Sequence, residues 1–575
     1  MDWPEAAQKG ALLAGGINVV LLAVVLATRR WWGWGKSATA ASEDSVPCGA
    51  TPVSSPRWFW PALLGILVLA GGLRWDLAHS SLWWDEVWQT RNAALGEWRP
   101  DKKNPGTFRF RETSVAQALW NYRKPTNHPP MALASKASHA VWSKLSGAKP
   151  GTLHEFALRF PGFVASLGGL ALLALLLRAW GLPGAGLAAA FFLAVHPFHV
   201  RYGIDCRGYT FLLPLTVAGL WALWRACGPG RPFAEQGLAG RGSPRTAWLL
   251  FGLCQALIMW CHLLSAWVCL ALCAAGAAWL WRGKNSGERT RGIARLLAAQ
   301  LLGAMVFFQL FMPNLLQAAQ WGDKNQDGQV LDLVLLKSMA AGLVDSPLEW
   351  TGVALLAALA LLGLVSAQPR ASWARWVFGL MIAACAVLWL ALAGAEFFFY
   401  KRFLFAALVP LAGLMALGLS AFAPCAATHP PPFGKTGTVL GGVLLLLIAA
   451  SFWPGLGFFQ RTPFTPLRET AAILKNEQAQ GARLFGYGFG AEALQYYLPG
   501  LEYDRGDNSA NSLAQALAEA KAAGHPLCVA IGYEELNRAG LPEGFALLDN
   551  PATFAEISRL PGVEPQFTFR VLKSK

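Results

Sequence analysis

Long apolar runs separated by short polar connections dominate the first 456 residues of the chain. A helix that spans a membrane needs about 20 apolar residues, and runs near this length predict such helices. The twelve predicted spans are 11–28, 58–74, 156–179, 184–200, 208–226, 246–262, 264–281, 293–313, 348–367, 373–395, 402–423 and 437–456. The pattern therefore predicts an all-α polytopic membrane protein with about 12 transmembrane helices.

The sequence changes character at about Phe458, where the apolar runs stop. Helices are expected at 468–478 and 509–523, and strands at 482–487, 526–531 and 566–572. Mixed helix and strand patterns of this kind are typical of a packed α/β domain. The predicted parts are an extra N-terminal helix with its linker (1–57), a transmembrane domain (58–456) with outer loops 75–155 and 314–347, and a C-terminal α/β domain (457–575).

Lysine and arginine are distributed unevenly between the connections. One alternating set of short connections carries 17 of these residues, and the short members of the other set carry 5. Cytoplasmic loops are enriched in both residue types, so the first set is predicted to be cytoplasmic. Both termini, the long loops and the C-terminal domain then face outward. Polar residues interrupt the apolar segment Met131–Leu145, which is therefore expected to lie on the membrane surface as a helix.

Composition supports the same class of protein. Apolar residues make up 54% of the chain and charged residues 14%, against about 25% charged residues in soluble domains. A purely soluble enzyme, a disordered chain, collagen and a coiled coil are thereby excluded. The net charge of +15 is explained by loop residues that orient the spans, so no nucleic-acid partner is expected. The 10 cysteines show no CxxC pair and predict no disulfide framework.

Two adjacent carboxylates, Asp85 and Glu86, follow the second predicted span among tryptophan and aliphatic neighbours. A carboxylate in such surroundings is costly to desolvate unless it is paired or used. Adjacent helical residues point about 100° apart, so one could act as a general base while the other makes a structural contact. The alternative is that Asp85 only caps a short helix.

Further polar residues lie at the predicted outer ends of the spans. His128 precedes Pro129-Pro130, and paired prolines could hold it against a lipid phosphate or could simply start a helix. The connection from His196 to Tyr209 contains Asp205 and Arg207, which could form a structural pair or serve a phosphate substrate.

Lys401 and Arg402 open the eleventh predicted span, either as interfacial anchors or as phosphate ligands. The segment Asp323–Gly328 matches the first half of a calcium loop. Its closing glutamate is replaced by Val334, so a turn-rich lid is the preferred interpretation.

Acids, cations and aromatic side chains thus gather at one end of the predicted spans. This arrangement permits a membrane-embedded transferase acting on a lipid phosphate, and it also permits a transporter. Transporters usually place ionisable groups near the membrane midplane. Here the spans hold few charges, which favours the enzyme.

The order of these motifs resembles that of GT-C class membrane glycosyltransferases, in particular protein O-mannosyltransferases (glycosyltransferase family 39) and lipid A aminoarabinose transferases. The matching elements are Trp84-Asp85-Glu86, His128-Pro129-Pro130, Arg159-Phe160-Pro161, the connection from His196 to Tyr209, and Lys401-Arg402-Phe403-Leu404 with Pro410. This chain departs from the family pattern at Ile204-Asp205, where relatives have Gln-Glu, and at Cys206, where they have Ala. The 11–28 helix is an addition to the family pattern.

The resemblance implies a GT-C fold and transfer of a sugar from a polyprenyl-phosphate donor, on the outer side of a bacterial inner membrane, with inversion at the anomeric carbon. It implies that Asp85 takes the proton of the acceptor hydroxyl, with Glu86 and Asp205 as the other catalytic carboxylates. The donor phosphate would be bound by His128, Arg207, Lys401 and Arg402, and Tyr209 would contact the substrate.

The resemblance leaves several alternatives open. The acceptor could be a protein, lipid A or an envelope polysaccharide. Membrane lipids are expected as further partners of the protein. Some relatives use a divalent metal and others do not, so no cofactor is required and a divalent cation remains an alternative. A polytopic carrier or flippase for polyprenyl-linked sugars is the alternative function, and an inactive scaffold with a partner-binding C-terminal domain is a third.

Overall fold

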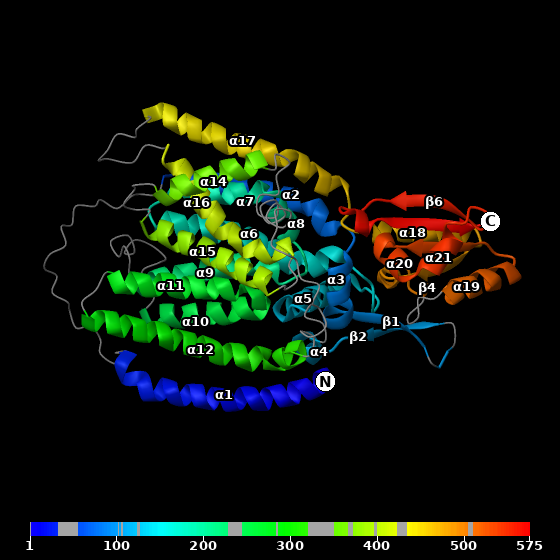
Figure 1. Cartoon of the computed structure of the whole chain (residues 1–575), viewed down its shortest axis with the longest axis horizontal. Helices are drawn as coiled ribbons and strands as arrows, with labels where there is room; N and C mark the ends of the chain where they lie inside the picture. Colours follow the sequence, from blue (N-terminus) through cyan, green and yellow to red (C-terminus); the bar gives the residue numbers. More distant parts are fainter. Residues whose placement is uncertain are drawn as a thin grey trace. The chain divides into compact units, whose positions relative to one another are not determined.

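Each predicted span overlaps a helix in the computed structural model of the chain (Figure 1). The structure describes residues 2–32, 56–101, 103–104, 107–122, 127–227, 244–282, 286–319, 350–365, 372–395, 400–422, 434–503 and 510–575. The matching helices are α1 (Trp3–Trp32), α2 (Phe59–His79), α6 (Glu155–Ala179), α7 (Pro183–Val195), α9 (Tyr209–Cys227), α10 (Pro244–Cys261), α11 (Ala266–Arg282), α12 (Ser286–Ala319), α14 (Trp350–Val365), α15 (Ser372–Gly394), α16 (Leu408–Ser420) and α17 (Gly434–Arg461).

Among the described residues, 9 helices are long and apolar enough to cross a membrane, and three shorter apolar helices lie at Pro183–Val195, Arg245–Cys261 and Ala354–Val365. Large apolar side chains on several of these helices are exposed on the surface of the described part of the protein. Examples are Leu12, Val19, Leu64, Val68, Leu446 and Leu447, which are between 57% and 79% exposed. Apolar surface of this extent is covered by lipid. The chain is a multi-pass membrane protein.

Two predicted spans are interrupted in the structure. The fourth, expected at 184–200, ends at Val195 because His196 is extended, and a short helix, α8 (Pro197–Tyr202), follows. A residue before proline is disfavoured in the helical conformation, which explains the break. The eleventh begins with a 3-10 helix (Lys401–Ala407) before α16 starts. Both interruptions place polar residues in irregular backbone.

The chain divides into two compact units. The first comprises residues 1–74, 119–131 and 162–456, and the second comprises 75–118, 132–161 and 457–575. The first contains most of the apolar helices. Its helix α1 packs along α12, as Figure 1 shows at the N-terminal end of the chain, and the Asn18 amide donates to the Gln309 side chain at 3.1 Å. The Arg295 guanidinium donates to the carbonyl of Trp32 at 2.7 Å.

Glycines permit a close crossing of α14 and α16. A Cβ placed on Gly418 would lie 2.0 Å from the carbonyl oxygen of Leu359, and one on Gly363 would lie 2.0 Å from that of Leu414. The two backbones therefore touch at this crossing, as small residues allow between membrane helices.

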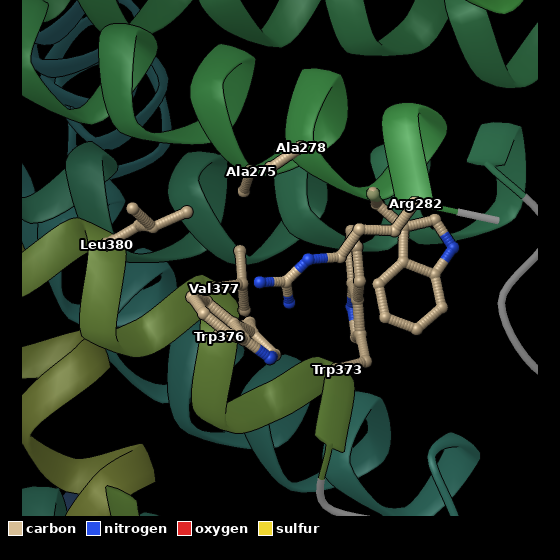
Figure 2. Close-up of a pocket in the computed structure, with 8 residues that line it drawn as sticks. Ala275, Ala278, Arg282, Trp373, Trp376, Val377 and Leu380 are labelled. Carbon is tan, nitrogen blue, oxygen red and sulfur yellow. The ribbon is translucent and has the colours of Figure 1, made fainter. Parts of the chain in front are cut away.

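Aromatic side chains gather where α11 ends and α15 begins. Figure 2 shows Arg282 beside Trp373 and Trp376, which line a small pocket with aliphatic residues of both helices. The Arg282 guanidinium lies 3.9 Å from the ring centre of Trp376. Tryptophan and arginine at helix ends are typical of anchors at a membrane interface.

The second unit contains a five-stranded mixed sheet. Its strands are β3 (Arg483–Tyr487), β4 (Glu502–Tyr503), β5 (Leu527–Ile531), β6 (Phe554–Leu560) and β7 (Phe569–Ser574). The order is β4-β3-β5-β7-β6, with β3 parallel to β4 and β5, and β7 antiparallel to β5 and β6. All five residues of β5 are buried, as expected for a strand covered on both faces. Its helices are α18 (Leu467–Ala479), α19 (Ala510–Ala522), α20 (Glu534–Gly540) and α21 (Pro542–Leu548).

The predicted α/β domain is thus present. The last strand was expected at 566–572 and starts at Phe569, because a 3-10 turn (Pro565–Phe567) occupies the residues before it. Several further elements precede α6 in the chain: α3 (Trp84–Gln89), a π-helix (Thr90–Ala94), the antiparallel hairpin of β1 (Gly96–Pro100) and β2 (Phe108–Glu112), α4 (Val115–Trp120) and α5 (Pro129–Ser146).

The segment predicted as a surface helix is α5. One of its faces packs on protein: the Ser135 hydroxyl donates to the carbonyl of Leu158 at 2.8 Å, and the Lys136 ammonium donates to that of Thr113 at 2.6 Å. The opposite face carries Val141 and Leu145, which are 60% and 83% exposed. Its place on a membrane surface stays a prediction.

Candidate functional site

Asp85 and Glu86 lie in the first turn of α3, in the second unit. The helix starts after Trp83, whose backbone N–H donates to Glu86 Oε2 at 3.3 Å, as in a capping box. Glu86 is fully buried, whereas Asp85 is partly exposed. The two adjacent carboxylates therefore have different surroundings, as their helical spacing predicts.

Arg159 on α6 binds Glu86. Its Nε donates to Glu86 Oε1 at 2.9 Å and its Nη2 to Glu86 Oε2 at 2.5 Å, and both side chains are at most 1% exposed. Its remaining N–H groups donate to the carbonyls of Leu77 at 3.0 Å, Ser80 at 2.6 Å and Ser81 at 3.0 Å. A buried ion pair is tolerated when its polar atoms are bonded in this way. Arg159 therefore fixes the chain that leads into α3.

His128 lies at the start of α5, in the first unit. The structure confirms that Pro129 starts the helix. The His128 ring is 3% exposed, and its Nδ1 donates to the carbonyl oxygen of Cys261 at 2.8 Å. A Cβ on Gly208 would lie 2.7 Å from this Nδ1, so the glycine allows the ring to approach the start of α9. The bond to Cys261 leaves Nε2 as the ring atom that can face a ligand.

A second histidine, His262, belongs to the same cluster, although the sequence analysis did not select it. It separates α10 from α11, and its ring stacks on that of His128 at 5.5 Å between centres. The ring of Tyr209 lies 5.1 Å from both imidazoles. A polar residue between two apolar runs was the signal that could have identified it.

Two guanidinium groups act on these histidines. Burial, and then the charges of Arg207 and Arg402, lower the pKa of His262 to about 3. Burial and the charge of Arg207 also hold the pKa of His128 well below its usual value. Both rings are therefore neutral at physiological pH. Within the described part of the chain, His128 Nε2 and His262 Nδ1 accept or donate no hydrogen bond.

Arg207 is 2% exposed, and its guanidinium carbon lies 6.0 Å from the ring centre of Tyr209. Arg402 is partly buried and stacks on Tyr400 at 4.1 Å. We name His128, Arg207, Tyr209, His262 and Arg402 the cationic cluster. The backbone of Lys401 is in the 3-10 helix beside Arg402, and its side chain lies outside the described residues.

Asp205 lies close to this cluster in sequence and is fully buried. Its Oδ1 accepts from Arg201 Nη1 at 2.6 Å, one helical turn earlier. The structure thus gives Asp205 a structural ion pair with Arg201. A Cβ placed on Gly162 would lie 3.0 Å from the carbonyl oxygen of Asp205. The glycine therefore allows this loop to pack closely on α6.

Arg74 is a further buried cation that the sequence analysis did not select. It is fully buried in α2 and donates to the carbonyls of Leu193 and Ala194 at 3.2 and 3.0 Å and to His199 Nδ1 at 2.7 Å. All of these contacts tie α2 to the break between α7 and α8. Arg74 therefore supports the loop that carries Asp205 and Arg207.

No group of three or more histidine, cysteine, aspartate or glutamate residues could hold a metal ion in the described segments. The calcium-like segment Asp323–Gly328 lies outside them.

Comparisons with known proteins give matches at the level of structure. No family model matches the chain, and no curated protein matches its sequence. The chain is similar to ArnT from Cupriavidus metallidurans bound to undecaprenyl phosphate, with a TM-score of 0.49 and 13% identity over 90% of this chain and 98% of that one. It is also similar to the oligosaccharyltransferase AglB from Archaeoglobus fulgidus in complex with an inhibitory peptide and a dolichol-phosphate, with a TM-score of 0.42 and 11% identity over 84% and 70%.

A third similar chain is the arabinosyltransferase EmbB from Mycobacterium smegmatis, with a TM-score of 0.39 and 14% identity over 77% of this chain and 43% of that one. ArnT is a lipid A aminoarabinose transferase, one of the groups that the motif order resembles. All three TM-scores are below 0.5, so the function has to be inferred from the residues of this chain.

Proposed function

We propose that the protein is a glycosyltransferase that moves a sugar from a polyprenyl-phosphate donor to an acceptor hydroxyl, with Asp85 as the general base. The observation that supports this proposal is the cationic cluster, in which Arg207 and the partly buried Arg402 lie beside two buried, neutral histidines near the start of α9 and the end of α10. Ionisable residues among membrane helices commonly mark substrate pathways. The motif order of the sequence supplies the sugar chemistry.

The charge of the cluster suits a leaving group that gains charge. A sugar phosphodiester carries one negative charge, whereas the phosphate monoester released from it carries about 1.5 to 2. Arg207 and Arg402 supply two positive charges at the low dielectric of a buried site. They would therefore stabilise the departing phosphate more than the intact donor, which is how a site lowers a barrier.

The reaction balances with one carboxylate. The acceptor oxygen attacks the anomeric carbon and forms the new glycosidic bond, while the bond from that carbon to the phosphate oxygen breaks. The electron pair leaves with the polyprenyl phosphate, and the hydroxyl proton passes to Asp85. Attack opposite the leaving group inverts the anomeric centre. General-base help of this kind contributes about 10²- to 10⁴-fold.

Glu86 is a poor choice for the same role. Both of its oxygens already bind Arg159 in a fully buried pair, so it would have to break these bonds to accept a proton. Asp85 is partly exposed on the same helix, and we assign the base to it. Asp205, buried against Arg201, is proposed to position the loop that carries Arg207.

The test is label transfer by detergent-solubilised protein from radiolabelled undecaprenyl-phosphate sugars, with bacterial envelope extract as acceptor. Asp85→Asn should lower turnover by about 10²- to 10⁴-fold, because amide nitrogen and oxygen cannot take the proton. It should still bind the labelled donor. Asp76→Asn, at an exposed position of α2, is the matched control and should behave like the wild type.

Three outcomes would contradict parts of the proposal. Equal transfer by Asp85→Asn and wild type would remove the base assignment. With the protein reconstituted in liposomes, movement of the labelled lipid between membrane leaflets without release of polyprenyl phosphate would favour a carrier. A wild type that neither transfers the sugar nor binds the donor would contradict the function itself.

A further inference from the structure

The segment Ser81–Trp84 ends directly before the proposed base. Residues of the C-terminal domain contact each of its four residues through hydrogen bonds or aromatic rings. Ser81 Oγ donates to Glu469 Oε2 at 2.9 Å and accepts from the backbone N–H of Arg468 at 3.1 Å. The backbone N–H of Leu82 donates to the Tyr497 hydroxyl at 2.9 Å. Ser81 and Leu82 are fully buried. These bonds replace the water that an outer loop would otherwise bind.

Aromatic contacts continue the same pattern. The ring of Trp83 lies 4.6 Å from that of Phe464 and 6.3 Å from that of Phe567. The ring of Trp84 lies 4.3 Å from that of Phe489 and 5.8 Å from that of Tyr533. Aromatic pairs in such arrangements stabilise a structure beyond the area that they bury. Together these contacts fix the angle at which the chain enters α3.

On the C-terminal side of these aromatic contacts, Tyr533 has an unusual backbone conformation and packs against a glycine. Tyr533 has a φ of 52°, and it is the one described residue other than glycine in the left-handed region. A Cβ on Gly490 would lie 2.6 Å from the Tyr533 ring, so glycine is required for the ring to take its place. A non-glycine residue in this conformation is held by its surroundings. The packing of Tyr533 against Trp84 and Phe489 supplies that restraint.

Arg159 restrains the same segment through its bonds to the carbonyl of Ser81 and to Glu86. The chain from Ser81 to Glu86 is therefore fixed by α6 and by residues of the C-terminal domain together. Asp85 lies within this restrained segment, directly before Glu86. A carboxylate that removes a proton must be placed to within a fraction of an ångström.

We propose that residues 457–575 are a positioning domain for the general base: through the contacts of Glu469 with Ser81, of Tyr497 with Leu82 and of Tyr533 with Trp84 they set the backbone from which Asp85 reaches the acceptor hydroxyl. This inference rests on the proposed function. Tyr497, Glu469 and Tyr533 are then positioning residues, and loss of one of their contacts lowers kcat without changing the binding of the donor. The domain would be required for catalysis itself, beyond any role in recruiting an acceptor.

Two adjacent tyrosines offer a matched pair of variants. Tyr497→Phe removes the oxygen that accepts from Leu82 and leaves a buried N–H without that partner. Tyr496→Phe removes a hydroxyl that donates to the carbonyl of Gly96 in the hairpin instead. We expect Tyr497→Phe to lower kcat by about 10- to 100-fold with an unchanged donor Kd. Tyr496→Phe should stay near the wild type.

Ser81 gives a second test that does not depend on tyrosine. Ser81→Ala removes both bonds to the start of α18, whereas Ser81→Thr keeps a hydroxyl. We expect the alanine variant to lose kcat and the threonine variant to recover most of it. Amide hydrogen exchange of the peptide spanning residues 80–89, measured by mass spectrometry, should rise in Tyr497→Phe and Ser81→Ala but not in Tyr496→Phe.

The exchange and activity measurements separate this inference from the proposed function. A raised exchange at 80–89 together with a lowered kcat and an unchanged donor Kd supports it. Equal kcat for Tyr497→Phe and Tyr496→Phe overturns it, as does unchanged exchange at 80–89 in Tyr497→Phe. A wild type without transferase activity contradicts the proposed function, and the exchange measurement then still decides whether the domain restrains the segment.

Discussion

The buried and partly buried arginines discussed above fall into two groups. One group is hydrogen-bonded to backbone carbonyls, and the other lies beside histidine rings. Arg159 donates hydrogen bonds to backbone carbonyls and to Glu86. Arg74 bonds to backbone carbonyls and to His199, so both arginines hold the backbone in place. Arg207 and Arg402 instead stand beside neutral histidines, whose pKa they depress. Under the proposed function, Arg207 and Arg402 are the arginines that bind the donor phosphate.

The depressed pKa of His262 predicts how stability depends on pH. In the unfolded chain the pKa is about 6.5, and in the folded protein it is about 3. Below pH 6.5, His262 binds a proton in the unfolded state but stays neutral in the folded state. Stability from this group is therefore complete above pH 6.5 and falls by up to about 1.4 kcal/mol per pH unit below it, until about pH 3.

Thermal unfolding in detergent between pH 7.5 and pH 5 checks this expectation. His262→Phe keeps the ring contacts with His128 and Phe403 but cannot titrate. Its Tm should fall less on acidification than that of the wild type. His525→Phe, at an exposed position, is the control. Parallel pH profiles for wild type and His262→Phe would contradict the prediction.

The residues of the site were only partly accessible from sequence. The pattern indicated Asp85, His128, Arg207 and Arg402, because charged groups at the ends of apolar runs are conspicuous. It could not show that Glu86 binds Arg159, since 73 residues separate them. His262 was missed because one histidine between two apolar runs looks like a short loop until the fold stacks it on His128.

At the scale of elements, length and hydrophobicity predict the membrane helices well because lipid leaves a helix few alternatives. Local chemistry decides the exceptions. The break at His196 follows from the proline after it, and the late start of β7 follows from Pro565. The hairpin of β1 and β2 was not predicted, although its strands alternate charged and aromatic residues, as Glu-Trp-Arg in β1 and Phe-Arg-Phe-Arg in β2.

The glycine crossing of α14 and α16 gives a prediction about packing. Gly418→Ala places a methyl group 2.0 Å from the Leu359 carbonyl oxygen, so the helices must separate. Gly442→Ala in α17 meets nothing within 4 Å. Alanine is favoured over glycine in a helix by about 1 kcal/mol, so the second change should be neutral or stabilising. We expect Gly418→Ala alone to lower the Tm in detergent, by about 1–3 °C for a loss of about 1–3 kcal/mol in a chain of this length. Equal Tm values would exclude a tight crossing.

At the scale of the whole molecule, the compact units do not follow the order of the sequence. The second unit joins residues 75–118 and 132–161 to the C-terminal segment 457–575. Composition shows where the C-terminal domain begins, because the apolar runs stop there. It cannot show that a loop more than 300 residues earlier folds with it, since that depends on contacts such as those of Ser81 with Glu469, 388 residues apart.

The uneven distribution of Lys and Arg predicts the orientation of the chain. Alkaline phosphatase fused after Lys575 should be active in bacterial cells, since this end is predicted to be extracytoplasmic. Green fluorescent protein fused after Arg282, in a predicted cytoplasmic connection, should fluoresce. The reverse pattern, with an inactive phosphatase and a dark fluorescent protein, would invert the topology and remove the outer placement of the site.

The packing of α1 along α12 has a consequence for synthesis of the protein. The ribosome completes α1 at Trp32 and begins α12 only at Ser286. At about 5–20 residues per second, roughly 13–50 s separate the two events. During that interval the Asn18 amide lies in the membrane before its partner Gln309 has been made. The nascent chain therefore depends on the translocon or an insertase to shelter α1 until the second half of the bundle arrives.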